Sequence, residues 1–88
     1  MSVTQIAEFT ADGALVRVMA TDELAAMTTG YDLPVIHGVV SRQSGETLIA
    51  LAPEHASERQ ARRLLEHLPA GVDLLLWQYP DRFWTVTS

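Results

Sequence analysis

The sequence predicts a single α+β domain over residues 1–88, with one mostly antiparallel sheet of about six strands and two helices packed on it. A chain of 88 residues can build one hydrophobic core but is too short for two. Its composition, 48% apolar and 19% charged, is typical of a globular protein. Short apolar runs also occur in pairs around glycine or proline turns, with helix signals between the pairs, which gives the order ββαββαββ.

The first hairpin is predicted to pair residues 3–10 with residues 15–20. Asp12-Gly13 lies between the two runs, and an Asp-Gly dipeptide between β-type segments is a signal for a tight hairpin turn. In the second run Val16, Val18 and Ala20 alternate with other residues, so they share one face of the strand. We expect this wholly apolar face to point into the core.

A first helix of about two turns is predicted over residues 21–30. Thr21 offers an N-cap hydroxyl and Gly30 a left-handed stop. A second hairpin then follows, with strands over residues 35–40 and 47–52. These strands are apolar on both faces, which predicts a central place in the sheet, covered on both sides by helices or by another subunit.

The second helix is predicted over residues 53–68. Pro53 suits a first helical position, and apolar residues recur with helical spacing at Ala61, Leu64, Leu65 and Leu68. The chain closes with a third hairpin, in which residues 72–79 turn at Pro80-Asp81 into residues 83–88.

Charge and composition exclude several classes of function. The net charge of −5 disfavours nucleic acid, because binders of nucleic acid usually carry a basic surface. The N-terminal residues lack the basic and apolar regions of a secretory signal, and no apolar run is long enough to cross a membrane. The chain has no cysteine, which excludes disulfides and thiolate metal sites and fits a cytoplasmic location.

Motif chemistry is absent from the sequence. No string matches a helical zinc site, a phosphate-binding loop or a nucleophile elbow. If His55 and His67 both lie on the helix over residues 53–68, they are roughly 18 Å apart at about 1.5 Å per residue and cannot share an ion. We therefore expect no metal and no cofactor, and the absence of catalytic motifs favours a protein that is not an enzyme.

Two groups of residues are candidates for binding a partner. One is the arginine face of the second helix, and the other is the aromatic cluster around the last turn; together they comprise Arg59, Arg62, Arg63, Trp77, Tyr79, Phe83 and Trp84. Arginine and aromatic residues are enriched at interfaces. The structural alternatives are a solvated helix face with Glu58–Arg62 pairing and a set of core aromatics.

His37 is the candidate for a ligand site, because it lies within an apolar run beside Gly38, where a ligand could approach the backbone. The structural alternative is a packed histidine with a satisfied ring nitrogen. The leading functional hypothesis is a non-catalytic interaction module: a small acidic regulator, inhibitor or accessory subunit that binds another protein and forms a homo-oligomer, at least a dimer.

The alternative hypothesis is a small-molecule-binding or enzymatic domain with a pocket between sheet and helix, where His37 and an arginine of the second helix hold an anionic ligand. A concave pocket at His37 with Arg59 or Arg63 at its rim would favour this alternative. A flat sheet face with an exposed Phe83 or Trp84 would favour the interaction module.

Overall fold

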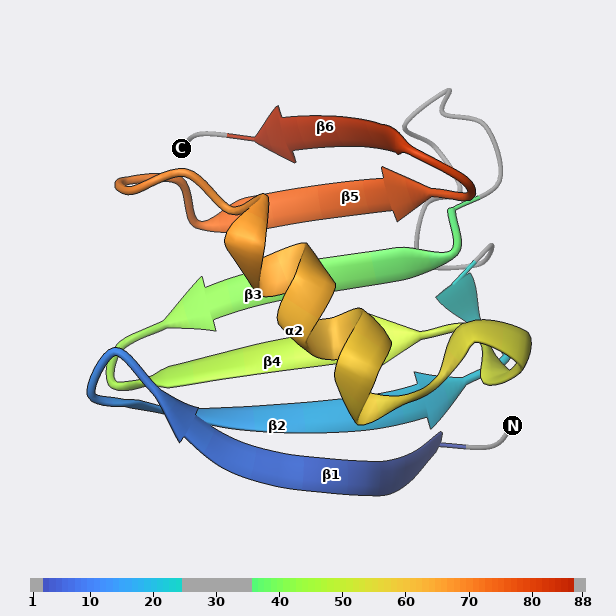
Figure 1. The fold of residues 1–88 in the computed structure, drawn as a ribbon, viewed down its shortest axis with the longest axis horizontal. Helices are drawn as coiled ribbons and strands as arrows, with labels where there is room; N and C mark the ends of the chain where they lie inside the picture. The colour runs from blue at the N-terminus through green and yellow to red at the C-terminus, as the bar shows by residue number, and fades with distance from the viewer. Residues whose placement is uncertain (1–2, 25–35, 87–88) are drawn as a thin grey trace.

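The computed structural model describes residues 3–24 and 36–86, and these form one six-stranded sheet with a single α-helix lying across one face (Figure 1). The α+β class and the single sheet are therefore confirmed. The elements, in chain order, are β1 (Val3–Ala11), β2 (Ala14–Thr21), β3 (Gly38–Gln43), β4 (Glu46–Leu51), the 3-10 helix η1 (Pro53–His55), α2 (Glu58–Glu66), β5 (Leu74–Gln78) and β6 (Arg82–Val86).

The sheet has the strand order β1-β2-β4-β3-β5-β6. The three expected hairpins are present, since β1–β2, β3–β4 and β5–β6 all pair antiparallel, as does β3–β5. The pairing of β2 with β4 is parallel, so the sheet is mixed. A parallel pair requires a crossover between its strands, and here the second hairpin turns back so that β4, rather than β3, lies beside β2.

The expectation of two helices in the order ββαββαββ is not confirmed. Residues 21–24 are described: Thr21 ends β2, and its Oγ1 accepts a hydrogen bond from the Glu23 backbone N–H at 3.2 Å. The rest of the helix expected over residues 21–30 lies outside the described residues. Leu24 is helical, and α2 is the one α-helix that lies wholly within the described residues.

The second helix is shorter than the sequence predicts. A continuous helix from Pro53 is wrong, because Pro53 begins only the 3-10 turn η1 and Ala56 after it is extended. The α-helix begins after Ser57, whose Oγ accepts a hydrogen bond from the Gln60 backbone N–H at 3.1 Å. This N-cap supplies the missing acceptor at the helix start. The α-helix therefore begins at the serine cap and not at the proline. His55 consequently lies off the helix.

The core lies between α2 and the sheet. Ala61 and Leu64 of α2 are fully buried against the inward face of the sheet, which carries Val16 and Val18, 1% and 0% exposed. The inward face predicted for β2 is thus confirmed. Among the described residues, no helix is long and apolar enough to cross a bilayer.

Gly38 sets how closely α2 approaches the sheet. A Cβ at this position would lie 2.8 Å from Trp77 Cε3 and 3.2 Å from Leu64 Cδ1. Both distances are shorter than van der Waals contact between carbon atoms. The glycine therefore lets the Trp77 ring and the helix pack directly on the backbone of β3.

Candidate functional site

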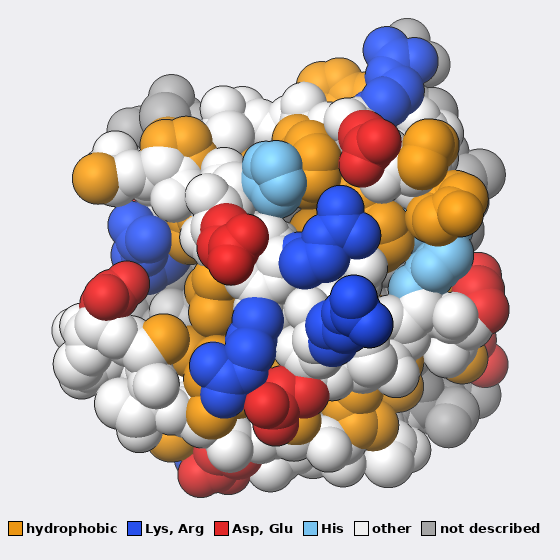
Figure 2. All heavy atoms as spheres, in the orientation of Figure 1, with side chains coloured by type: hydrophobic (Ala, Val, Ile, Leu, Met, Phe, Trp, Pro, Cys, Tyr) orange, Lys and Arg blue, Asp and Glu red, His pale blue; other side chains and the backbone are white. Residues whose placement is uncertain are grey.

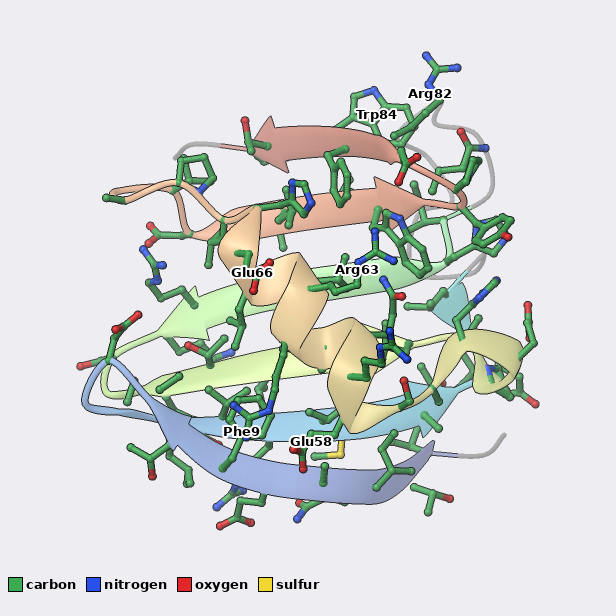
Figure 3. The ribbon with its side chains drawn as sticks, in the orientation of Figure 1. Phe9, Glu58, Arg63, Glu66, Arg82 and Trp84 are labelled. Carbon is green, nitrogen blue, oxygen red and sulfur yellow. The ribbon has the colours of Figure 1, made fainter. Side chains whose placement is uncertain are left out.

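The aromatic cluster around the last turn divides between the two faces of the sheet. Trp77 is 2% exposed and belongs to the core. Phe83 packs against the core on the same side, where the His67 ring stacks on it with centroids 4.2 Å apart. Trp84 lies on the opposite face beside the guanidinium of Arg82, 5.5 Å from the ring centroid (Figure 3). Tyr79 is 58% exposed, whereas Phe83 and Trp84 are both half-buried, so Tyr79 is the exposed aromatic of this group.

The arginine face of α2 is largely compensated by carboxylates. Arg62 Nε lies 3.0 Å from Glu58 Oε2, as the spacing predicts, and its guanidinium covers the Phe9 ring at 4.0 Å. Arg63 lies 3.9 Å from Asp81. Basic and acidic side chains are intermixed over this face of the molecule (Figure 2). Of the three arginines, only Arg59 has no ion pair with a described residue.

His37 lies immediately before β3 rather than in the middle of a strand. Its backbone N–H donates to the Trp77 carbonyl at 2.8 Å, and its carbonyl accepts from the Ala52 N–H at 2.9 Å. Its ring Nδ1 accepts from the Tyr79 backbone N–H at 2.9 Å. The imidazole therefore acts as an extra acceptor that ties β5 to the start of β3. This arrangement fits the packed histidine with a satisfied ring nitrogen.

The structure brings His37 together with His55 and Glu54, a group that the sequence analysis did not anticipate. Their potential ligand atoms all lie within 4.8 Å of one another, and the His55 ring stacks on Tyr79 with centroids 4.8 Å apart. Reasoning from the sequence missed this because it placed His55 on a continuous helix. The signal that could have found it was Ser57, which restarts the helix after His55.

This group does not fit a metal ion. A neutral imidazole has one lone pair, and in His37 that lone pair is on Nδ1, where the Tyr79 N–H occupies it. We therefore assign the ring proton to Nε2. Metal-bound histidines instead donate their second nitrogen to an oxygen acceptor. Without His37, Glu54 and His55 are the two potential ligands that remain in this group among the described residues, and two ligands are too few for a protein zinc site.

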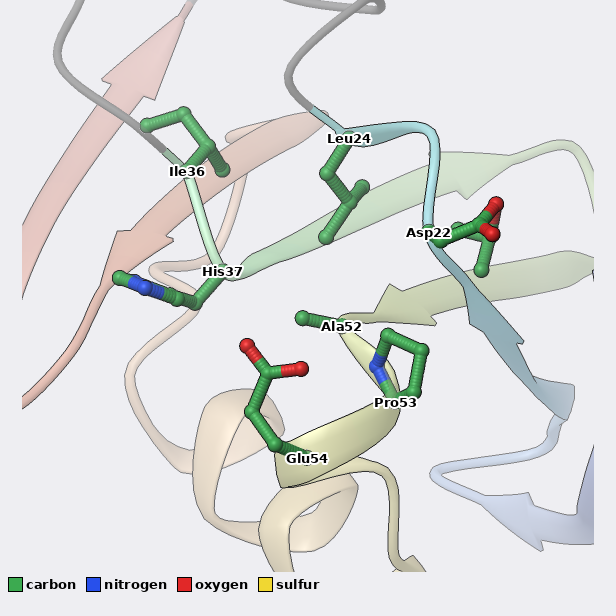
Figure 4. Close-up of a pocket in the computed structure, with 8 residues that line it drawn as sticks. Asp22, Leu24, Ile36, His37, Ala52, Pro53 and Glu54 are labelled. Carbon is green, nitrogen blue, oxygen red and sulfur yellow. The ribbon is translucent and has the colours of Figure 1, made fainter.

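A cavity of about 190 Å³ opens beside His37, with Leu24, Ile36 and Ala52 among the apolar residues of its wall. Among the described residues, the charged ones that line it are Asp22 and Glu54, and the Glu54 carboxylate lies toward the His37 ring (Figure 4). No arginine of the described ranges lines it. The alternative hypothesis needed an arginine of the second helix here, so the charges of this cavity disfavour an anionic ligand.

The face of the sheet opposite α2 is here called the rear face. By register it carries, on all six strands, apolar side chains at alternate positions: Val3, Leu15, Met19, Val39, Leu48, Ala50, Leu74, Leu76, Trp84 and Val86. Most are half-buried, while Leu76 is buried and Val3 and Val86 are exposed. No described helix packs on this face.

A groove of about 280 Å³ runs over the middle of the rear face. Its lining includes Val3 and Met19 from β1 and β2, and Val39, Leu48 and Ala50 from the central strands. An ion pair borders the apolar area, with Arg17 Nε 3.1 Å from Glu46 Oε1. Sequence reasoning saw that the central strands are apolar on both sides, but it did not assign these residues to a site.

Comparison of the chain with protein families, with curated proteins and with solved structures finds no match.

Proposed function

We propose that this chain is a non-catalytic interaction module, of the regulator or accessory-subunit type, that binds through its rear face. The observation that carries the proposal is the apolar groove of about 280 Å³ over the central strands of that face. A contiguous apolar surface rimmed by polar residues is the usual mark of a protein interaction site. Trp84, which shares the face, is of the residue type most enriched among residues that dominate binding energy.

The occupant that we propose is a second copy of the chain. A two-fold interface places the same surface on both partners, so the surface must complement itself. With the two-fold axis parallel to the strands, β1 of one copy lies over β6 of the other. Met19, Ala50, Val39 and Leu76 lie on one cross-strand row of the rear face. This axis places each row over the same row of the other copy, so Met19 lies over Leu76 and Ala50 lies over Val39, with apolar side chains on both sides of the contact.

The size of the rear face also suits a dimer. Six strands at about 4.8 Å spacing, each with about six residues at 3.3 Å, give roughly 500 Å² of projected area. The accessible area of a side-chain surface exceeds its projection, and a standard interface buries about 800 Å² per partner. The net charge of −5 opposes association at low salt, so the apolar contact has to supply most of the affinity.

Sedimentation equilibrium at micromolar concentrations tests the proposal. We expect the native chain to be dimeric and Leu48→Glu to be monomeric, because a carboxylate in the groove has no partner when the groove is covered. Thr85→Glu is the matched control: it adds the same charge on the other side of the sheet and should leave the dimer intact. A native mass near 9.7 kDa throughout this range would overturn the proposal.

A further inference from the structure

A cavity of about 340 Å³ lies on the α2 side of the sheet, at the end away from His37. Leu65 and Leu68, from the last turns of α2 and just after it, form its roof. The turn between β1 and β2 and the turn between β3 and β4 bound the cavity; both lie at the same end of the sheet (Figure 1).

The floor of the cavity changes character from strand to strand. Val16 of β2 is the register partner of Thr47 on β4, and Thr47 is in turn the partner of Arg42 on β3. Since partners lie about 4.8 Å apart on one face, these residues form a row from apolar, through hydroxyl, to cationic. Such a row matches an amphipathic molecule with a negative group at one end.

Thr47 is the first sign that the cavity takes a ligand. The residue is 5% exposed and lines the cavity, yet its hydroxyl makes no hydrogen bond to any residue in the described ranges. The Thr47 oxygen is not among the buried side-chain atoms that lack a partner, so it reaches the surface of the cavity. A hydroxyl in this position is free to donate to a bound acceptor.

Arg42 is the second sign. Its backbone N–H donates to the Asp73 carbonyl at 2.7 Å, which fixes its strand position next to β5. Its guanidinium forms no ion pair with a described residue, whereas Arg17, Arg62 and Arg63 each lie beside a carboxylate. The planar fork of arginine matches a carboxylate in a bidentate geometry.

We propose that this cavity binds a small monocarboxylate with an apolar body. The carboxylate pairs with Arg42 and accepts from the Thr47 hydroxyl, and the apolar body lies on Val16 and under Leu65. Asp12 lines the cavity on the β1–β2 side, and its charge disfavours a second negative group at that end. This ligand site is additional to the proposed interaction function and lies on the other face of the sheet.

Titration with hexanoate, followed by amide NMR spectra, tests the site. We expect saturable shifts that concentrate in residues 11–16, 42–47 and 65–68. Hexylamine, which has an alkyl chain one carbon longer and the opposite charge, should still bind at least tenfold more weakly, because it loses the charge-assisted bond and faces Arg42. No saturable hexanoate binding, shifts centred elsewhere, or equal binding of hexylamine would each overturn the proposal.

Two substitutions separate recognition from folding. Arg42→Gln should weaken hexanoate binding about tenfold, while Arg82→Gln, which removes an arginine of the rear face, should leave it unchanged. Thr47→Val keeps the side-chain shape and removes a hydroxyl that has no partner in the described ranges, so it should leave the melting temperature of the ligand-free protein nearly unchanged while weakening hexanoate binding severalfold. If Thr47→Val bound hexanoate like the native chain, or if the two arginine variants bound alike, the assigned roles would be wrong.

Discussion

Single residues decide how the layers of this molecule fit together, and Gly38 shows this most clearly. It stands at the start of β3, where the Trp77 ring and Leu64 of α2 reach the strand from two directions. In the sequence, the same glycine suggested a place where a ligand approaches the backbone. The structure fills that space with the protein's own core, and His37 beside it uses its ring as a backbone acceptor.

Replacement of Gly38 by alanine should destabilise the protein by about 1–3 kcal/mol, the usual cost of overpacking a core. The added methyl would lie 2.8 Å from Trp77 Cε3, so either the ring or the strand has to move. Urea unfolding measures the loss of free energy. Trp77→Phe in the same chain makes room for the added methyl, so Gly38→Ala should cost less free energy in that background. The effects of the two substitutions should therefore be non-additive.

A control distinguishes overpacking from backbone strain. Gly71 has φ of +83° and nothing within 4 Å of an added Cβ, so Gly71→Ala costs stability through its backbone alone. The loss of unfolding free energy caused by Gly71→Ala should be the same with and without Trp77→Phe. If Gly38→Ala were neutral, or if Trp77→Phe gave it no relief, the close approach would not be what the glycine permits.

At the scale of elements, the break between η1 and α2 positions two features: His55 beside His37, and the helix that covers the cavity at Leu65 and Leu68. Because Ala56 is extended, the 3-10 turn carries His55 toward Tyr79 while α2 crosses the sheet at its own angle. The helix has only nine residues, too few to be stable in isolation. Its start therefore depends on the N-cap and its course on the burial of Ala61 and Leu64.

Loss of the N-cap should be measurable. Ser57→Ala removes the acceptor for the Gln60 N–H, and we expect a loss of about 1 kcal/mol in the free energy of unfolding. Ser44→Ala, an exposed serine in the turn between β3 and β4, is the matched control and should change it by less than about 0.5 kcal/mol. Equal effects in thermal or urea unfolding would mean that α2 is held by packing alone.

At the scale of the whole molecule, one sheet separates the two proposed binding surfaces, which differ in character. The rear face is broad and apolar, and its proposed use is association with a second copy. The cavity under Leu65 and Leu68 lies on the α2 side of the sheet, over strands β2, β4 and β3. Side chains that alternate along a strand cannot serve both faces, so the two proposals rest on separate residues.

This separation predicts that the two functions are independent. Leu48→Glu, which should give a monomer, ought to bind hexanoate with the affinity of the native chain, because Leu48 and Thr47 are adjacent in sequence but point to opposite faces. Thr47→Val should conversely leave the dimer intact. The measurement is a hexanoate titration of the monomeric variant, with sedimentation of the Thr47 variant. A marked loss of affinity in the monomer would mean that the sites are coupled.

The sequence by itself determined what neighbouring residues control. Asp12-Gly13, with positive φ at both residues, makes the first turn; alternation in β2 gives the buried Val16 and Val18; and the spacing of Ala61 and Leu64 gives the buried side of α2. Turn geometry and side-chain period are local properties, so they can be predicted from short segments. The three hairpins and the α+β class follow from them.

Only the tertiary structure decided which distant segments meet. The parallel pairing of β2 with β4 places Val16 beside Thr47, and so creates the row that ends at Arg42. The break before Ser57 brings His55 to His37. Pairing between strands far apart in the chain depends on the packing of the whole sheet against α2 rather than on the residues of either strand, and for that reason no local pattern foretold the cavity or the histidine pair.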